Sequence, residues 1–284
     1  MLVQPQVQAF HHAATGTWSY VASDPATRAA AIIDPVLDFD AASGRIATTS
    51  AQALLDHVRA HGLQVQWLLE THAHADHLTA AQWLKAQLPR ARIAIGHGIC
   101  EVQHTVAPRL GLTGTLAEDG SQFDHLFGDD ETFRLGDLQA RAIPVPGHTR
   151  DSLAYLVGDA LFTGDSLFMP DAGSARCDFP GGDAATLYRS IQRLFALPGD
   201  TRVFVCHDYG VRAADGSGRE PRCQTSIGEQ KRDNIHVRDG TTEAAFIAMR
   251  TARDATLSEP ALLLPALRVN LRGGVYPETG NPGA

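Results

Sequence analysis

A cluster of metal-binding residue types directly follows an apolar segment of this chain. Residues 65–77 read VQWLLETHAHADH, so three histidines and an aspartate fall within six positions after the apolar run. Side chains two apart in extended backbone point to the same side, which groups His72 with His74, and a turn brings Asp76 and His77 round. Imidazole and carboxylate suit zinc, iron or manganese. A histidine-rich polar loop is the alternative that this segment alone leaves open.

Three later segments have the same form, an apolar run that ends on a ligand-type side chain. They contain His148 in PVPGHTRDS, Asp165 in LFTGDSLF and His207 in RVFVCHDY. Taken singly, each is an ordinary turn residue or cap. Because open α/β sheets keep their chemistry beyond the carboxyl ends of strands, four such strand ends in one chain predict a shared metal site.

Strand and helix patterns alternate in both halves of the chain, and no linker separates the halves. Strand patterns occur at 17–22, 28–36, 65–70, 91–96, within 138–165 and at 202–206, and helix patterns at 49–62, 78–88, 183–195 and 241–253. We therefore expect an α/β fold in which two sheets pack face to face with helices outside.

Composition excludes several classes of function. The 284 residues include 44% hydrophobic and 20% charged residues, as in a soluble globular domain, and the net charge of -8 provides no basic footprint for nucleic acid or an anionic membrane. No apolar run approaches the roughly 20 residues of a membrane span. The N-terminus lacks a secretory pattern, so we expect a cytoplasmic protein with free thiols. None of the four cysteines forms a CxxC pair, and strand alternation is expected to point Cys206 away from His207.

The ordered motifs H-x-H-x-D-H, P-G-H-T and T-G-D, followed by a strand-end histidine, resemble those of the metallo-β-lactamase superfamily. The resemblance covers about residues 10 to 210 and implies a four-layer αββα sandwich with a metal site at one edge. We expect one domain over residues 1–284, in which 208–284 form a C-terminal extension packed on the sandwich. The superfamily includes thioesterases, nucleases and dioxygenases, so the motif order does not name a reaction.

Longer segments resemble the persulfide dioxygenase branch of this superfamily. They are ETHAHADH, VPGHTRDSLAYLVGDALFTGDSLF, ARCDFPGGDAATLYRSI and HDYG. The resemblance implies one Fe(II) per chain, held by His72, His148 and Asp165, with up to three positions open for a substrate sulfur and O₂. The implied reaction converts glutathione persulfide, O₂ and water to sulfite and glutathione. A homodimer or homotetramer is also expected from the resemblance, with no nucleic-acid or membrane partner.

Further residues are candidates for roles around this iron. The remaining ligand types would surround the iron or persist from a second metal site; they are His74, Asp76, His77 and His207. Tyr209 is a candidate catalytic residue whose hydroxyl reaches the open positions, and a packed aromatic is the alternative. Arg176 and Lys231 are candidate anchors for the carboxylates of glutathione, and ordinary surface charge is the alternative.

A second reaction remains open from the ligand types. All seven ligand positions of a two-metal hydrolase are present, so a binuclear zinc thioesterase of the glyoxalase II type is the alternative function.

Overall fold

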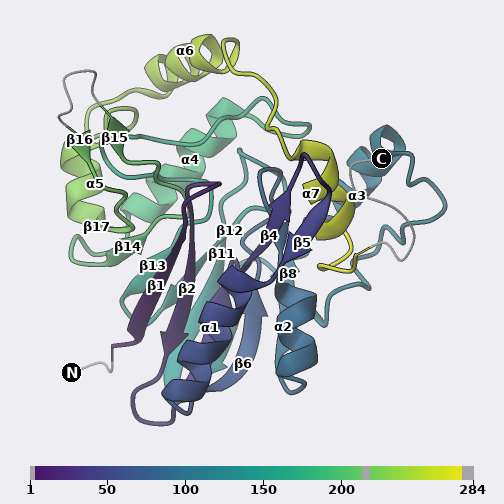
Figure 1. Cartoon of the computed structure of the whole chain (residues 1–284). Helices are drawn as coiled ribbons and strands as arrows, with labels where there is room; N and C mark the ends of the chain where they lie inside the picture. Colours follow the sequence, from purple (N-terminus) through teal and green to yellow (C-terminus); the bar gives the residue numbers. More distant parts are fainter. Residues whose placement is uncertain (1–3, 213–217, 277–284) are drawn as a thin grey trace.

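Two six-stranded sheets form the centre of the molecule. The computed structural model describes residues 4–212 and 218–276. The strand orders are β1-β2-β3-β6-β8-β9 in the first sheet and β10-β11-β12-β13-β14-β17 in the second. The two sheets face each other, and helices lie on their outer sides (Figure 1).

The first sheet comes from the N-terminal half of the chain. Its strands are β1 (Gln6–His12), β2 (Thr17–Ser23), β3 (Ala29–Ile33), β6 (Gln64–Leu69), β8 (Arg92–Gly96) and β9 (His125–Phe127). The pairs β3–β6, β6–β8 and β8–β9 are parallel, and every residue of β3 is buried. Parallel strands covered on both faces read as continuous apolar runs, which explains the segments AAAII and WLL.

The second sheet comes mainly from the middle of the chain. Its strands are β10 (Thr132–Leu135), β11 (Leu138–Pro144), β12 (Leu153–Val157), β13 (Ala160–Phe162), β14 (Arg202–Phe204) and β17 (Gln224–Ser226). All neighbours are antiparallel except β13 and β14. Aromatic side chains from both sheets, including Tyr20, Phe127 and Tyr155, fill the space between them.

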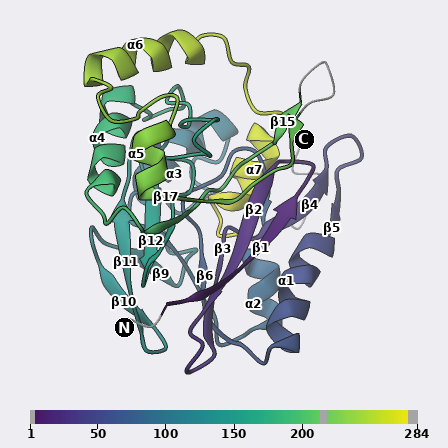
Figure 2. The same ribbon diagram turned by 90° about the vertical axis from the view of Figure 1, so that its left-hand side faces the viewer.

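Helices close both outer faces. They are α1 (Thr49–Ala60), α2 (Ala81–Gln87), α3 (Ile99–Val106), α4 (Ala184–Phe195), α5 (Ile227–Asp233), α6 (Glu243–Asp254) and α7 (Leu263–Asn270), with a short 3₁₀ helix η1 (Ala107–Leu110). In Figure 2, α4 and α5 lie on one side of the strands, and α1 and α2 lie on the other. The predicted four-layer sandwich is therefore confirmed. None of the helices in the described part of the chain combines the length and apolarity that crossing a membrane requires.

One predicted helix begins later than its sequence pattern suggests. The sequence pattern predicts a helix over 78–88, but α2 begins at Ala81 because Leu78 and Thr79 form the short strand β7 (Leu78–Thr79). This strand pairs with β4 (Val36–Asp40), which also pairs with β5 (Arg45–Ala47). The histidine-rich segment is thus followed by a strand of a separate three-stranded sheet, in the order β5-β4-β7. A further hairpin, β15 (Val211–Arg212) and β16 (Gly218–Arg219), lies after the second sheet's β14.

Candidate metal centre

Three side chains predicted as iron ligands lie together at one edge of the sandwich. His72 follows β6, His148 follows β11 and Asp165 follows β13, and their ligand atoms are within 4.8 Å of one another. Asp165 Oδ2 is 4.0 Å from His72 Nε2 and 3.7 Å from His148 Nε2. The strand ends of both sheets therefore contribute to one cluster, as their sequence pattern predicts.

Two glycines allow the loops of this cluster to approach closely. Gly147 has a φ of 135°, and a Cβ there would lie 2.4 Å from the backbone of Leu187 in α4. Gly164 has a φ of 51°, and a Cβ there would lie 2.6 Å from Oγ1 of Thr71. Both positions need left-handed backbone with no side chain, so the residues beside His148 and Asp165 are fixed by steric constraint.

Hydrogen bonds leave the Nε2 lone pairs of the two histidines available. His148 Nδ1 donates to the carbonyl oxygen of Arg176 at 2.7 Å. Thr71 Oγ1 donates to Asp34 at 2.9 Å, so the 3.1 Å contact from His72 Nδ1 to this hydroxyl requires the imidazole to donate. A proton on Nδ1 leaves Nε2 as the ligand atom in both rings. Burial lowers the pKa of His72 well below its usual value, which keeps the ring neutral.

Buried polar atoms without hydrogen-bond partners are concentrated in this cluster. Among the described residues they include His72 Nε2, Asp165 Oδ1, Asp76 Oδ2, His77 Nε2 and His207 Nε2. An unsatisfied buried polar group costs about 1–3 kcal/mol, so several together in one place call for a ligand. Because these atoms are imidazole nitrogens and carboxylate oxygens, they fit a transition-metal cation.

His74 contacts different residues from those around His72, His148 and Asp165, which we call the trio. Its Nε2 lies 3.0 Å from Oδ1 of Asp34, which also accepts a hydrogen bond from the backbone N–H of Thr71 at 2.7 Å. Burial acts against protonation, but the Asp34 carboxylate outweighs it and raises the pKa of His74 to about 10. Burial, with the charge of Asp34, raises the pKa of nearby Glu70 to about 8. Asp34 and Glu70 were not predicted as site residues, although Asp34 follows the apolar run AAAII in the same way as Asp165 follows its strand.

The remaining ligand types form a second group beside the trio. His207 Nε2 lies 3.2 Å from Asp76 Oδ2 and 3.3 Å from Asp165 Oδ1. Burial, and then the neighbouring His74, lowers the pKa of His77 to about 3. Against the effect of burial, His207 and His77 lower the pKa of Asp76 to about 2. The ligand atoms of the two groups are therefore sufficient for either one metal ion or two.

The orientation expected for Cys206 is wrong. Its thiol belongs to a group with His74, His77 and His207 whose ligand atoms are within 4.8 Å of one another. Strand alternation does not apply, because β14 ends at Phe204 and Cys206 lies in the segment that pairs with the start of β2. Burial raises the pKa of Cys206 well above its usual value, so this side chain is a protonated thiol.

A cavity of about 520 Å³ is lined by His148 and Asp165 of the first group and by Asp76 and His207 of the second group. Its polar floor includes His148, Asp165 and His207, and its wall includes Phe168 and Phe179. A site lined by apolar and aromatic groups around a few polar ones is typical for a small molecule.

Three predicted residues occupy different places relative to this cavity. Tyr209 lines it, with a side chain 68% exposed and a ring parallel to that of His207. Arg176 lines it too, but its guanidinium donates to Asp178 at 2.6 Å and to the carbonyl of Ser258 at 2.8 Å. Lys231 lies on α5 and is absent from the described residues that line the cavity.

Two arginines that were not predicted as site residues also line this cavity. Arg253, in the last turn of α6, lines it. Arg250, one turn earlier, also lines it but is buried against Asp254. The i, i+3 spacing of two arginines in a predicted helix was the available signal.

The chain belongs to the metallo-β-lactamase superfamily, whose sequence pattern it matches over residues 14–207. It is 48% identical over 274 residues to "Beta-lactamase hydrolase-like protein" of Xylella fastidiosa strain Temecula1, covering 96% of this chain and 62% of that protein. The chain thus spans less than two thirds of the length of this relative. It is 43% identical over 273 residues to "Glyoxylase B2" of Dictyostelium discoideum, covering 96% of this chain and 92% of that protein.

Two further similar proteins carry the name ETHE1. The chain is 32% identical over 196 residues to "Persulfide dioxygenase ETHE1, mitochondrial" of Homo sapiens, covering 68% of this chain and 64% of that protein. The crystal structure of ETHE1 from Myxococcus xanthus superimposes with a TM-score of 0.74 at 30% identity, covering 95% of this chain and all of that one (100%).

Proposed function

We propose that this protein is an iron-dependent sulfur dioxygenase that oxidises glutathione persulfide with O₂ to sulfite and glutathione. The observation that carries the proposal is the division of the histidine cluster. His72, His148 and Asp165 form a group of three, whereas Nε2 of His74 faces Asp34. Two histidines and one carboxylate with open positions are typical of non-haem Fe(II) oxygenases. The similarity to proteins named ETHE1, one of them named persulfide dioxygenase, supports the same reading.

One iron ion per chain would be held by His72, His148 and Asp165. Ferrous iron, when bound, supplies the redox chemistry that lets O₂ react with a sulfur atom. The protein's contribution is to keep both Nε2 atoms unprotonated, through the carbonyl of Arg176 and the hydroxyl of Thr71. The other ligand types, Asp76 and His207 among them, would shape the pocket around the metal.

The cavity would position the substrate by its two ends. Its floor receives the sulfane sulfur, while Phe168 and Phe179 exclude water from one side. Arg253 and Arg176 at the cavity would bind the carboxylates of glutathione by charge-assisted hydrogen bonds. Tyr209 would present its hydroxyl to the bound persulfide as the catalytic residue of the chain.

A binuclear zinc hydrolase of the glyoxalase II type is the second candidate. The group formed by Asp76, Asp165 and His207 favours it, because this group could hold a second metal that shares Asp165 with the first. The relative named Glyoxylase B2 is consistent with this alternative.

The two functions differ in metal and in their need for O₂. Protein purified without added metal should contain about one iron per chain, as three ligands for one metal require. Glutathione persulfide should drive O₂ uptake and sulfite release, and glutathione, which lacks the sulfane sulfur, should not. S-Lactoylglutathione should be hydrolysed poorly. Two zinc ions per chain, with thioester hydrolysis at the same rate under nitrogen, would establish the alternative instead.

A further inference from the structure

The predicted metal ligand His148 is oriented by one backbone carbonyl. Its Nδ1 donates to the carbonyl oxygen of Arg176 at 2.7 Å, and its Nε2 lies 3.7 Å from Oδ2 of Asp165. Arg176 belongs to the segment 174–177, which is mostly irregular backbone between β13 and α4. The polar groups of such backbone are paired with other parts of the molecule, and those contacts decide where this carbonyl points.

Helix α6 contacts this segment on both sides of Arg176. Nη1 of Arg250 donates to the carbonyl oxygen of Ser174 at 3.0 Å. The backbone N–H of Cys177 donates to Oδ2 of Asp254 at 2.8 Å. One helix therefore fixes the chain two residues before the carbonyl and one residue after it.

The two side chains of α6 also bind each other. Nε and Nη2 of Arg250 lie 2.8 and 2.6 Å from Oδ1 of Asp254, and the two residues are only 2% and 6% exposed. Desolvation offsets most of the attraction in a buried ion pair, so stability alone is a weak reason for such a pair. What this pair provides is fixed geometry, because all three guanidinium nitrogens have an acceptor and both carboxylate oxygens have a donor.

The chain that leads into the segment is held from the same part of the molecule. Asn234 Nδ2 donates to the carbonyl oxygen of Gly173 at 3.0 Å, and His236 Nδ1 accepts the N–H of Ser174 at 2.9 Å. Both residues and α6 lie beyond residues 14–207, over which the chain matches the superfamily. A ligand inside the matched region therefore depends for its orientation on residues outside it.

We propose that Arg250 and Asp254 are positioning residues that orient His148 toward the metal through the segment 174–177. The inference rests on the proposed function in taking His148 as a metal ligand. A carbonyl fixed opposite Nδ1 keeps the ring proton on that nitrogen, so Nε2 stays free to bind the metal. When the segment shifts, the ring loses this partner and its proton is shared between both nitrogens. Both positioning residues act through the backbone of the segment.

A double variant separates positioning from stability. Asp254→Ala alone leaves Arg250 buried without its carboxylate, which destabilises the fold. Arg250→Met/Asp254→Leu removes both charges and keeps similar volumes, so its urea midpoint should stay close to that of the wild-type protein. It still lacks the acceptor for the N–H of Cys177. Loss of a group that orients a ligand typically costs about 10- to 100-fold in metal affinity, so the dissociation constant for Zn(II), titrated into metal-free protein, should rise by that factor.

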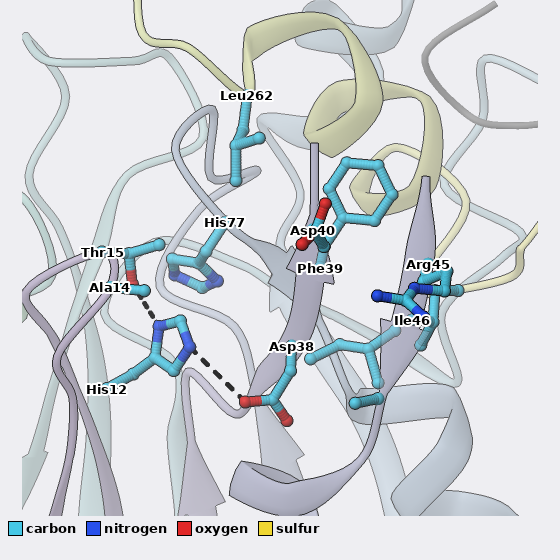
Figure 3. A pocket seen from close by; sticks show the side chains of 12 residues that line it. His12, Ala14, Thr15, Asp38, Phe39, Asp40, Arg45, Ile46, His77 and Leu262 are labelled. Carbon is cyan, nitrogen blue, oxygen red and sulfur yellow. Dashed lines mark hydrogen bonds and ion pairs between the residues drawn. The ribbon is translucent and has the colours of Figure 1, made fainter. Parts of the chain in front are cut away.

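Two control variants should keep the wild-type affinity for Zn(II). Glu243→Ala breaks an exposed ion pair between α6 and α4, in which the carboxylate lies 2.8 Å from Nη1 of Arg189. Asp38→Ala removes the acceptor for the N–H and the hydroxyl of Ser50 at the start of α1, and so lowers stability far from the segment. Figure 3 shows Asp38 beside His12 in a second cavity, of about 690 Å³. Among the described residues, none lines both this cavity and the cavity at the metal centre, here called the metal cavity.

The ring of His148 reports its orientation directly. In metal-free protein labelled with ¹⁵N at histidine, the ring shifts should show the proton on Nδ1 in mildly alkaline solution. The double variant should move these shifts toward a mixture of the two tautomers, while His72, whose Nδ1 faces Thr71, should keep its own. His148→Asn identifies the signal. A general loss of structure would change both histidines, whereas a loss of positioning changes one.

The result that would overturn the inference is a double variant with wild-type affinity for Zn(II) and unchanged ring shifts of His148. The pair would then stabilise the fold and nothing more. Neither measurement needs O₂ or a persulfide, so the proposed function is judged separately. If the wild-type protein hydrolyses a thioester and consumes no O₂, the dioxygenase fails, while the positioning of His148 stands or falls on the metal affinity and the ring shifts.

Discussion

The two sheets end at the same edge of the sandwich, but they place different kinds of site there. The loops after the first sheet carry Asp34, Glu70, His72 and His74, whose exposures are 2%, 3%, 1% and 0%. None of these four lines the metal cavity. From the second sheet, His148, Asp165 and His207 all line it.

This difference follows from the way that each sheet is covered. The strands β3, β6 and β8 are parallel and buried on both faces, so polar groups at their ends lie among protein atoms and must satisfy one another. The first sheet thus provides a closed polar base that holds His72. The second sheet and the segments after it provide most of the face that a substrate meets, and Ala75 and Asp76 of the loop after β6 also line it.

The largest expected effect separates the two acidic neighbours of His207. Asp165→Asn should abolish iron retention, because two histidines hold a labile ferrous ion poorly, and Asp76→Asn should retain it. The two variants make the same chemical change, and both carboxylates lie within 3.3 Å of His207 Nε2. Metal analysis after gel filtration measures the difference. Equal loss from both variants would mean that the second group also holds a metal.

A second prediction concerns the buried polar groups after the first sheet, in particular the pair of Asp34 and His74. Asp34→Ala leaves His74 buried without its carboxylate, and breaking a buried pair in this way costs about 3–5 kcal/mol. Urea unfolding of the metal-free protein should show this loss, while Asp56→Ala on the exposed face of α1 should change stability by less than about 0.5 kcal/mol. The double variant Asp34→Ala/His74→Ala should lose less than the sum of the single variants. Additive losses would show that the two side chains do not interact.

The substrate face should respond in KM instead of stability. Loss of a charge-assisted hydrogen bond of about 1.5–3 kcal/mol predicts a rise in KM of about 10- to 100-fold for Arg253→Ala and Arg176→Ala. Lys231→Ala should keep the wild-type KM, because Lys231 is not among the described cavity-lining residues. Steady-state kinetics with glutathione persulfide provide the measurement. A rise in Lys231→Ala alone would place the carboxylates of the substrate elsewhere.

The smallest expected effect is a change in how stability depends on pH. It concerns His236, which lies behind the cavity wall on the side of the second sheet. His236 Nδ1 accepts the backbone N–H of Ser174 at 2.9 Å, and burial, with the charge of Arg250, lowers the pKa of His236 to about 4. Between about pH 6.5 and pH 4 the unfolded chain binds a proton that the folded chain does not, so stability falls as the pH falls through this window. Above it the contribution is fully present. His236→Gln should flatten the dependence of the urea midpoint on pH, and the surface variant His61→Gln should not.

The sequence predicted the layers, and it predicted that His72, His148 and Asp165 lie together, because both depend on local pattern. An apolar run followed by His or Asp marks a strand and its end, and the ends of neighbouring strands converge. The Asp34–His74 pair depends instead on the packing of two strand ends 40 positions apart in the sequence, and neither segment alone specifies it. The same limit applies to Lys231, because the basic run in α5 does not indicate which way that helix faces.

The contact between Gly16 and Tyr209 couples two properties that an engineer would wish to adjust separately. A Cβ at position 16 would lie 2.5 Å from the Tyr209 ring, so this aromatic side chain covers the β1–β2 turn and also forms part of the cavity wall. Trimming Tyr209 to admit a bulkier substrate uncovers the turn that carries Thr15. A side chain at position 16 displaces the Tyr209 ring and so alters the cavity wall. Substrate range and turn rigidity therefore depend on the same contact. Redesign of either property has to consider positions 16 and 209 together.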